Sequence, residues 1–176
     1  MIDFSLRPAN FADVPAIAAI YAEAVLSGTA TFEIEVPGEA EMERRMTALL
    51  EGGFPYLVAE RAGALLGYGY AGRYRERIAY RHTVEDSIYL APEARGQGVG
   101  AALLKVLVQE CEALDFRQIV AVIGDSTNEP SIRVHRSAGF DLIGTLRDVG
   151  FKHGRWLDTV LMQKTLGAGG GAPPSR

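Results

Sequence analysis

The sequence predicts one domain of the α+β class, in which a mixed sheet and helices form layers. The chain has 176 residues, which is long enough to bury one substantial core. The spacing of its apolar residues predicts the following order of elements: strand, two helices, three strands, helix, strand, helix, two strands. A strand that ends near Pro92 leads through a glycine-rich loop into a long helix, which predicts a crossover between parallel strands.

The amino-terminal region is predicted to contain one strand and two helices. Residues 2–7 alternate apolar and polar side chains, as a half-buried strand does. Asn10 and Asp13 have the spacing of a capping box at a helix start. The helix that follows carries its apolar residues on one face: Val14, Ile17, Tyr21, Ala24 and Val25. Residues 27–33 interrupt it, and a second helix with Met42 and Met46 ends at Gly52.

The middle of the chain is predicted to form three strands. Residues 56–60 and 65–72 read as a hairpin with its turn at 61–64. Gly67 and Gly69 lie inside the second strand, which indicates close approach of another backbone or a ligand. A basic and aromatic connection then leads into a strand at 83–90.

The carboxy-terminal region is predicted to contain a buried strand, a short helix and two further strands. The apolar run 118–123 indicates the buried strand, and Pro130 marks the start of the helix, which ends near Gly139. Strands at 141–149 and 155–164 complete a domain at 1–166. Residues 167–176 are rich in Gly and Pro, and we expect them to be disordered.

The composition favours a soluble cytoplasmic protein. Eighteen basic against 22 acidic residues give a net charge of −4, which disfavours nucleic-acid binding. No apolar run has the roughly 20 residues needed to span a bilayer, and the first residues do not resemble a signal peptide. Cys111 is the one cysteine, and we expect it to be a buried apolar filler.

The glycine-rich loop at residues 95–101 is predicted to bind a pyrophosphate. Glycines at a strand-to-helix turn let backbone N–H groups approach an anion at the helix N-terminus. No Gly-Lys-Ser/Thr follows, which disfavours a nucleoside-triphosphate loop. Gly96-x-Gly98-x-x-Ala101 fits a loose dinucleotide pattern, but the chain lacks the doubly wound domain that this pattern needs.

Arg95-x-x-Gly98-x-Gly100 resembles the coenzyme A loop of the GNAT superfamily, the acetyl-CoA-dependent N-acetyltransferases. The predicted element order is also that of this family. Asn128-x-x-Ser131, followed by His135 and Gly139-Phe140, is similar to its second cofactor motif. Residues 29–33, 80–87 and 150–158 resemble the narrower phosphinothricin/methionine sulfoximine acetyltransferase branch.

The resemblance implies a GNAT fold of about six to seven strands and about four helices, acetyl-CoA as cosubstrate, and a homodimer. It places the cofactor on the backbone amides of the strand that leads to the loop, on the loop itself, and on the second motif. These residues are Ile88, Tyr89, Leu90, Arg95, Gly96, Gln97, Gly98, Val99, Gly100, Ala101, Asn128 and Ser131. Asn128 could also cap its helix. The three histidines lack metal-ligand spacing, so no metal is predicted.

Two side chains are candidate catalytic groups. Glu85 lies on the strand that enters the loop and could accept the amine proton as general base, or could form a surface ion pair instead. Partial burial should raise its pKa. His135 stands where many relatives have a tyrosine. It could protonate the departing thiolate, pair with Glu85, or be a structural histidine of the core.

The substrate site is predicted from charge and aromatic character. Arginine binds a carboxylate through a bidentate fork, which favours Arg75 and Arg77, with Arg73 next. Phe32 and Trp156 are candidates for an apolar wall, and Thr83 is a further candidate contact.

The function indicated by the resemblance is acetyl transfer to the α-amine of a small amino acid or analogue. Phosphinothricin, methionine sulfoximine and methionine sulfone are the acceptor types implied. A peptide or protein N-terminal acetyltransferase is an alternative that needs an open groove. A non-catalytic acyl-CoA sensing module is a second alternative function, and a nicotinamide dehydrogenase is the least favoured one.

Overall fold

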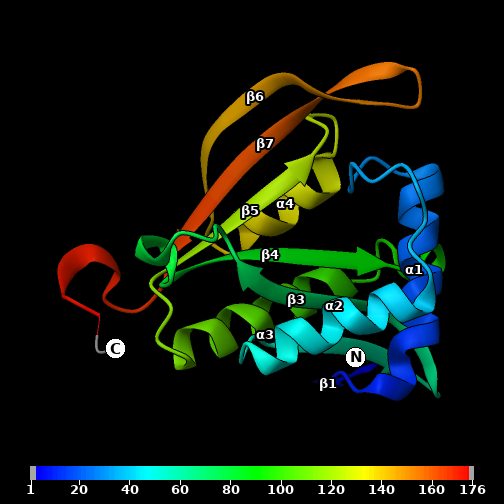
Figure 1. The fold of residues 1–176 in the computed structure, drawn as a ribbon, viewed down its shortest axis with the longest axis horizontal. Helices are drawn as coiled ribbons and strands as arrows, with labels where there is room; N and C mark the ends of the chain where they lie inside the picture. Colours follow the sequence, from blue (N-terminus) through cyan, green and yellow to red (C-terminus); the bar gives the residue numbers. More distant parts are fainter. Residues whose placement is uncertain (1–2, 175–176) are drawn as a thin grey trace.

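The computed structural model describes residues 3–174, which form a seven-stranded sheet with helices on both faces (Figure 1). The strands are β1 (Ser5–Pro8), β2 (Tyr56–Arg61), β3 (Ala64–Arg73), β4 (Thr83–Leu90), β5 (Gln118–Gly124), β6 (Asp141–Lys152) and β7 (Arg155–Thr165). The helices are α1 (Val14–Ser27), α2 (Glu39–Glu51), α3 (Val99–Ala113) and α4 (Glu129–Ser137). The sheet order is β1-β2-β3-β4-β5-β7-β6. The predicted α+β class and element order are confirmed.

The first helix starts through the predicted capping box. The backbone N–H of Asn10 donates to Asp13 Oδ2 over 2.8 Å, and Asn10 Oδ1 accepts from the Ala12 N–H over 2.9 Å. A short 3-10 turn, η1 (Phe11–Asp13), leads directly into α1. Strand β1 begins three residues later than predicted, and Ile2 lies outside the described residues.

Strands β2 and β3 form the predicted hairpin, with Ala62 and Gly63 at positive φ in its turn. Gly67 lies where β3 and β4 are in contact. A Cβ at this position would lie 2.5 Å from Leu90 Cδ2 and 2.7 Å from the carbonyl oxygen of Tyr89. The close approach predicted from the glycines of β3 is therefore confirmed, and it lets the end of β4 pack tightly on β3.

The two faces of β4 meet different helices. Tyr89 packs edge-on against Tyr21 of α1, with ring centroids 5.0 Å apart. Ile88 faces the other side, where α3 covers the sheet and where a Cβ at Gly69 would lie 4.0 Å from Leu103 Cβ. Because side chains alternate along a strand, the odd-numbered residues of β4 face α1 and α2 and the even-numbered ones face α3 and α4.

The end of the chain contains one short helical turn. Disorder at 167–176 stays a prediction from composition; in the structure, residues 167–174 include the 3-10 helix η4 (Gly169–Gly171). Leu166 is buried, and the N–H of Gly167 donates to Glu112 Oε1 over 3.1 Å. These contacts hold the turn against α3. Residues 175–176 lie outside the described range.

Candidate active site

The sheet opens between β4 and β5. In the described part of the chain these strands are the one parallel pair, and their register covers only Thr83–Asp86 against Gln118–Ala121. Beyond that point β4 keeps its pairing with β3, while β5 turns away, as Figure 1 shows. The backbone groups on this edge of residues 87–90 therefore face a gap between strands, where a ligand can meet them.

The glycine-rich loop lies between the end of β4 and the N-terminus of α3. Gly96 and Gly98 have φ of 76° and 82°, and nothing lies within 4 Å of a Cβ built on either. Gly98 is the N-cap of α3, and among the described residues no side chain caps the helix there. The first-turn N–H groups are thus available to an anion, which fits the predicted pyrophosphate.

Two loop side chains fasten the loop to its neighbours. Arg95 forms an ion pair with Glu23 of α1. Gln97 accepts a 3.0 Å hydrogen bond from Arg61 of β2 and donates to the carbonyl oxygen of Glu93. These contacts fix the loop and leave its backbone as the surface presented to a ligand.

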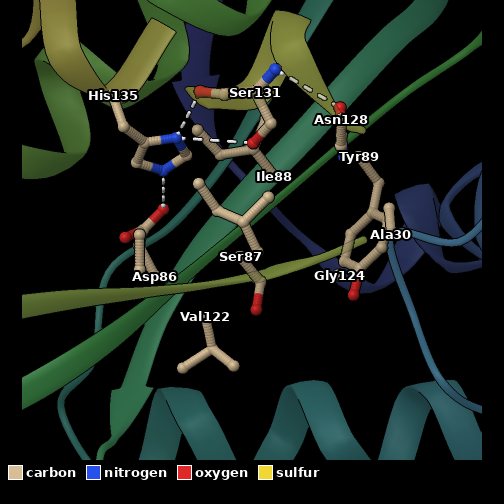
Figure 2. Close-up of a pocket in the computed structure, with 12 residues that line it drawn as sticks. Ala30, Asp86, Ser87, Ile88, Tyr89, Val122, Gly124, Asn128, Ser131 and His135 are labelled. Carbon is tan, nitrogen blue, oxygen red and sulfur yellow. Dashed lines mark hydrogen bonds and ion pairs between the residues drawn. The ribbon is translucent and has the colours of Figure 1, made fainter. Parts of the chain in front are cut away.

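A cavity of about 60 Å³ occupies the gap and is here called the β4–β5 cleft (Figure 2). Its lining includes residues from β4, β5, α4 and the loop after α1: Ala30, Asp86, Ser87, Ile88, Tyr89, Ala121, Val122, Ile123, Gly124, Asn128, Ser131 and His135. Asn128 Oδ1 accepts from the Ser131 N–H over 3.3 Å. The cap does not use the amide nitrogen of Asn128, so this residue can cap α4 and still donate to a ligand.

His135 is buried at the cleft, but it does not contact Glu85. Its Nε2 lies 3.0 Å from Asp86 Oδ2, and its Nδ1 lies 2.8 Å from the carbonyl oxygen of Ser131. The alternative of a Glu85–His135 pair is therefore wrong, because adjacent residues of β4 point to opposite faces. Burial opposes the charge on the ring, but the hydrogen bond and charge of Asp86 outweigh it and raise the pKa of His135.

A larger cavity of about 490 Å³ lies on the opposite face of β4, under α2. We call it the arginine cavity. It is lined by Arg44, Arg45, Ala48, Leu49, Phe54, Tyr70, Gly72, Arg73, Glu76, Glu85 and Ser87. Ser87 lines this cavity and the β4–β5 cleft alike. The two cavities therefore border the same residue of β4.

Glu85 is half-buried where β4 borders the arginine cavity. Burial raises the pKa of Glu85, the charge of Arg75 opposes this, and the charge of Asp86 adds to it. The carboxylate thus has the position and the raised pKa expected of a general base.

The arginines of the cavity only partly match the predicted ones. Arg73 lines it, but Arg75 places its guanidinium 4.4 Å from the Tyr74 ring centre, and neither Arg75 nor Arg77 is among the lining residues. The connection after β3 leaves the sheet, so these two side chains are exposed.

Sequence reasoning missed the two lining arginines of α2. Arg45 donates to Glu33 Oε1 over 2.6 Å, and Arg44 donates to Glu41 Oε2 over 2.7 Å. In the sequence they resemble the ordinary polar face of an amphipathic helix, which gives no functional signal. Asp86 was missed too, although strand alternation already places it opposite Glu85.

The three other predicted substrate residues do not line the arginine cavity. Trp156 is 61% exposed and packs against Phe151 on the β6–β7 hairpin, and Thr83 lies at the start of β4. Phe32 lies over the end of β5, where a Cβ at Gly124 would be 3.1 Å from its ring. The loop after α1 folds onto β5, so Phe32 covers the sheet there.

Among residues 3–174, no group of three His, Cys, Asp or Glu side chains could hold a metal ion. Within the same range, no helix is both long and apolar enough to cross a bilayer. Cys111 is buried in α3, and burial raises the pKa of its thiol to about 12, so it is an unreactive filler of the core.

The known proteins that resemble this chain are acetyltransferases. A family model described as acetyltransferase (GNAT) domain matches residues 6–161. The phosphinothricin N-acetyltransferase of Alcaligenes faecalis is 55% identical over 157 residues, which cover 89% of this chain and 80% of that protein. The L-methionine sulfoximine/L-methionine sulfone acetyltransferase of Pseudomonas paraeruginosa is 39% identical over 170 residues, which cover 96% of this chain and 98% of that protein.

A solved structure is similar over nearly the whole chain. It is a GNAT superfamily phosphinothricin acetyltransferase from Sinorhizobium meliloti, in complex with AcCoA. The two share a TM-score of 0.96 and 51% sequence identity, and the match covers 99% of this chain and 94% of that one.

Proposed function

This chain belongs to the GNAT acetyltransferase family, and from that premise we propose that it acetylates the α-amine of a small amino-acid-like acceptor. Like its relatives it is an N-acetyltransferase that uses acetyl-CoA. The proposed acceptors are of the phosphinothricin, methionine sulfoximine or methionine sulfone type, which the names of the similar proteins indicate.

One observation carries the proposal: Ser87 joins the arginine cavity to the β4–β5 cleft. An acceptor in the arginine cavity would present its amine at β4, next to Glu85. The acetyl end of acetyl-CoA, bound through the glycine-rich loop, the backbone of residues 88–90 and Asn128, would reach the same point from the other side. This arrangement brings amine and thioester together and reduces the entropy cost of their meeting.

Glu85 is the proposed general base. Its carboxylate lines the arginine cavity and has a raised pKa, so it can take a proton from the acceptor ammonium or amine. The open backbone edge of residues 87–90 can donate hydrogen bonds to the thioester carbonyl as negative charge develops on it.

Arg73 is the proposed partner of the acceptor carboxylate. It lines the arginine cavity, and the structure gives it no ion pair within residues 3–174, whereas Arg44 and Arg45 are held by Glu41 and Glu33. An arginine without an acidic partner can offer its fork to a ligand without first breaking a salt bridge.

The deciding experiment is a thiol-release assay with acetyl-CoA against a panel of amines. The panel contains free amino acids, methionine sulfoximine, methionine sulfone, phosphinothricin and short peptides. Strong turnover with a sulfoximine, sulfone or phosphinate supports the proposal. Turnover with peptides alone would favour the protein N-terminal acetyltransferase alternative. Tight coenzyme A binding without turnover of any amine would favour the sensing module.

We also propose that the enzyme is a homodimer. Strand β6, at the edge of the sheet, exposes a group of large apolar side chains: Leu142, Ile143, Leu146, Val149 and Phe151, each at least 50% exposed. Exposed apolar side chains that gather on one strand are stabilised when another protein surface covers them, and we propose that a second copy of this chain does so. Analytical ultracentrifugation of the wild type and of Val149→Glu tests this, and a monomeric wild type would contradict it.

A further inference from the structure

Asp86 and His135 form a buried pair (Figure 2). Because side chains alternate along a strand, the pair lies on the face of β4 opposite Glu85. Their side chains are only 2% and 6% exposed, and Nε2 lies 3.0 Å from Oδ2. Both residues line the β4–β5 cleft and neither lines the arginine cavity. The proposed function gives the acceptor side a base, but it leaves the departing sulfur without a proton source.

The hydrogen bonds of the ring fix the number of its protons. Nδ1 faces the carbonyl oxygen of Ser131 at 2.8 Å, and a carbonyl only accepts, so Nδ1 carries a hydrogen. Nε2 faces the carboxyl group of Asp86, so a second proton lies between these two atoms. The pair therefore holds one proton more than a neutral histidine beside a carboxylate would hold.

The surroundings of the pair favour keeping that proton. Asp86 Oδ1 is buried with no hydrogen-bond partner in the described residues, so His135 is the partner that balances this carboxyl group. Among residues 3–174, Cys111 of α3 and Glu85 of β4 are two further titratable groups that interact with Asp86. Neither can supply positive charge. A deprotonated His135 would leave a buried carboxylate uncompensated, which is costly.

We propose that Asp86 is a positioning residue, which holds His135 protonated at the β4–β5 cleft so that His135 supplies the proton taken by the departing sulfur. This inference rests on the proposed function. Ser131 Oγ lies 3.4 Å from Nδ1 and lines the same cleft, so it offers a route for the proton.

The proposed step balances. The acceptor nitrogen forms a bond to the acetyl carbon, and the bond from that carbon to sulfur breaks with its electron pair going to sulfur. Glu85 takes the proton released by the nitrogen, and sulfur takes a proton from His135. Along the proposed route, the Ser131 hydroxyl passes its proton to sulfur and takes the Nδ1 proton of His135 in exchange. The ring is left neutral with its hydrogen on Nε2, Asp86 remains a carboxylate, and Nδ1 is protonated again from solvent.

The strand itself keeps base and acid apart. If a protonated histidine touched Glu85, the two would form an ion pair and neither could serve its role. Because residues 85 and 86 point to opposite faces of β4, His135 pairs with Asp86 while Glu85 stays open to the acceptor. The pairing thus assigns opposite proton transfers to opposite faces of one strand.

The first test is an NMR titration of the histidine ring in the full-length protein without ligand. We expect the His135 ring to be mainly doubly protonated at pH 6.5, and Asp86→Asn to lower the pKa of His135 by about one unit or more. A mainly neutral His135 ring at pH 6.5 in the wild type would overturn the proposal, even if the Asp86 variant failed to fold.

The second test is the pH dependence of turnover. A group that must be protonated gives a rate that falls as pH rises through its pKa. Asp86→Asn should therefore move the alkaline limb of kcat to lower pH and reduce kcat at pH 8 by roughly tenfold or more. The His135→Gln variant should already lack the alkaline limb of kcat. Adding Asp86→Asn to that variant should therefore change kcat little.

Asp13→Asn is the matched control, since Asp13 is another buried carboxylate, forms an ion pair with Arg7, and lines neither cavity. It should destabilise the fold without moving the alkaline limb. An unmoved limb in a folded Asp86→Asn variant would refute the positioning role. If the wild type acetylated no amine, the proposed function would fail, while the titration would still decide whether Asp86 controls the protonation of His135.

Discussion

The β4–β5 cleft and the arginine cavity lie on either side of the same strand, yet they are built in different ways. The cleft opens through the backbone, since the parallel ladder ends at Asp86 and Ala121, and glycines then carry the loop after β4 into α3. The arginine cavity depends on side chains from separate elements, α2, β3 and β4.

The difference indicates which part of the site is general and which is specific to this chain. A backbone cleft can be formed by many sequences that keep the glycines and the strand register, and it suits a cosubstrate common to a family. A cavity lined by arginines and a glutamate changes with single substitutions. We therefore expect changes in the cavity to alter use of the acceptor, and changes in the cleft to alter use of acetyl-CoA.

The largest effect is expected at the proposed base, on the cavity side of β4. Glu85→Gln removes the proposed base and keeps the size of the side chain, so kcat should fall by roughly 10²- to 10⁴-fold. The KM for acetyl-CoA should change little, because Glu85 lines the arginine cavity and not the cleft. Steady-state kinetics with both substrates varied measure this.

The pH profile provides the control for that variant. The base must be deprotonated to act, so the wild-type rate should rise with pH through a midpoint above the usual glutamate pKa, in the direction that burial sets for Glu85. Glu85→Gln should lack this acidic limb. If the limb persisted in the variant, another group would be the base.

A substitution on the cavity side should separate binding of the acceptor from binding of acetyl-CoA. Arg73→Gln removes the proposed partner of the acceptor carboxylate, and hydrogen bonds to charged groups contribute about 1.5–3 kcal/mol. The acceptor KM should therefore rise by roughly 10- to 100-fold, with the acetyl-CoA KM unchanged. Arg77→Gln is the matched control, since Arg77 is exposed and does not line the cavity. Equal effects of the two variants would contradict the assignment.

The smallest effect is expected on the cleft side. Asn128→Ser keeps a side-chain oxygen that can cap α4 but removes the amide donor. Loss of one hydrogen bond to the pantetheine arm should raise the acetyl-CoA KM by about 2- to 10-fold without changing the acceptor KM. Thermal unfolding should show near wild-type stability. A fall in stability with unchanged kinetics would mean that Asn128 serves only as a cap.

Local patterns in the sequence predicted most of the fold. The capping box of Asn10 and Asp13, the hairpin turn at Gly63 and the close contact at Gly67 each depend on a few neighbouring residues, and each is present in the structure. The disorder expected of the tail from its composition stays a prediction; in the structure Leu166 is buried and the N–H of Gly167 donates to Glu112.

The candidate site was predictable where one segment supplies it. Glu85 and the glycine-rich loop lie within one strand–loop–helix stretch; Glu85 lines the arginine cavity, and the loop leads into the uncapped N-terminus of α3. Arg44, Arg45 and the partner of His135 were not predicted, because their roles depend on contacts between residues far apart in the chain. Phe32 and Trp156 were placed in the substrate wall on aromatic character alone, which carries no information on the direction in which a loop or hairpin folds.

The sequence by itself determined the order of the elements, the position of the glycine-rich loop and the acid on β4, since spacing and residue type control local backbone geometry. Only the tertiary structure decided that β4 and β5 separate after Asp86, that α2 brings its arginines over Glu85, and that His135 pairs across to Asp86. These features depend on strand register and on which helix covers which face. Many side chains distributed along the chain fix both of these together.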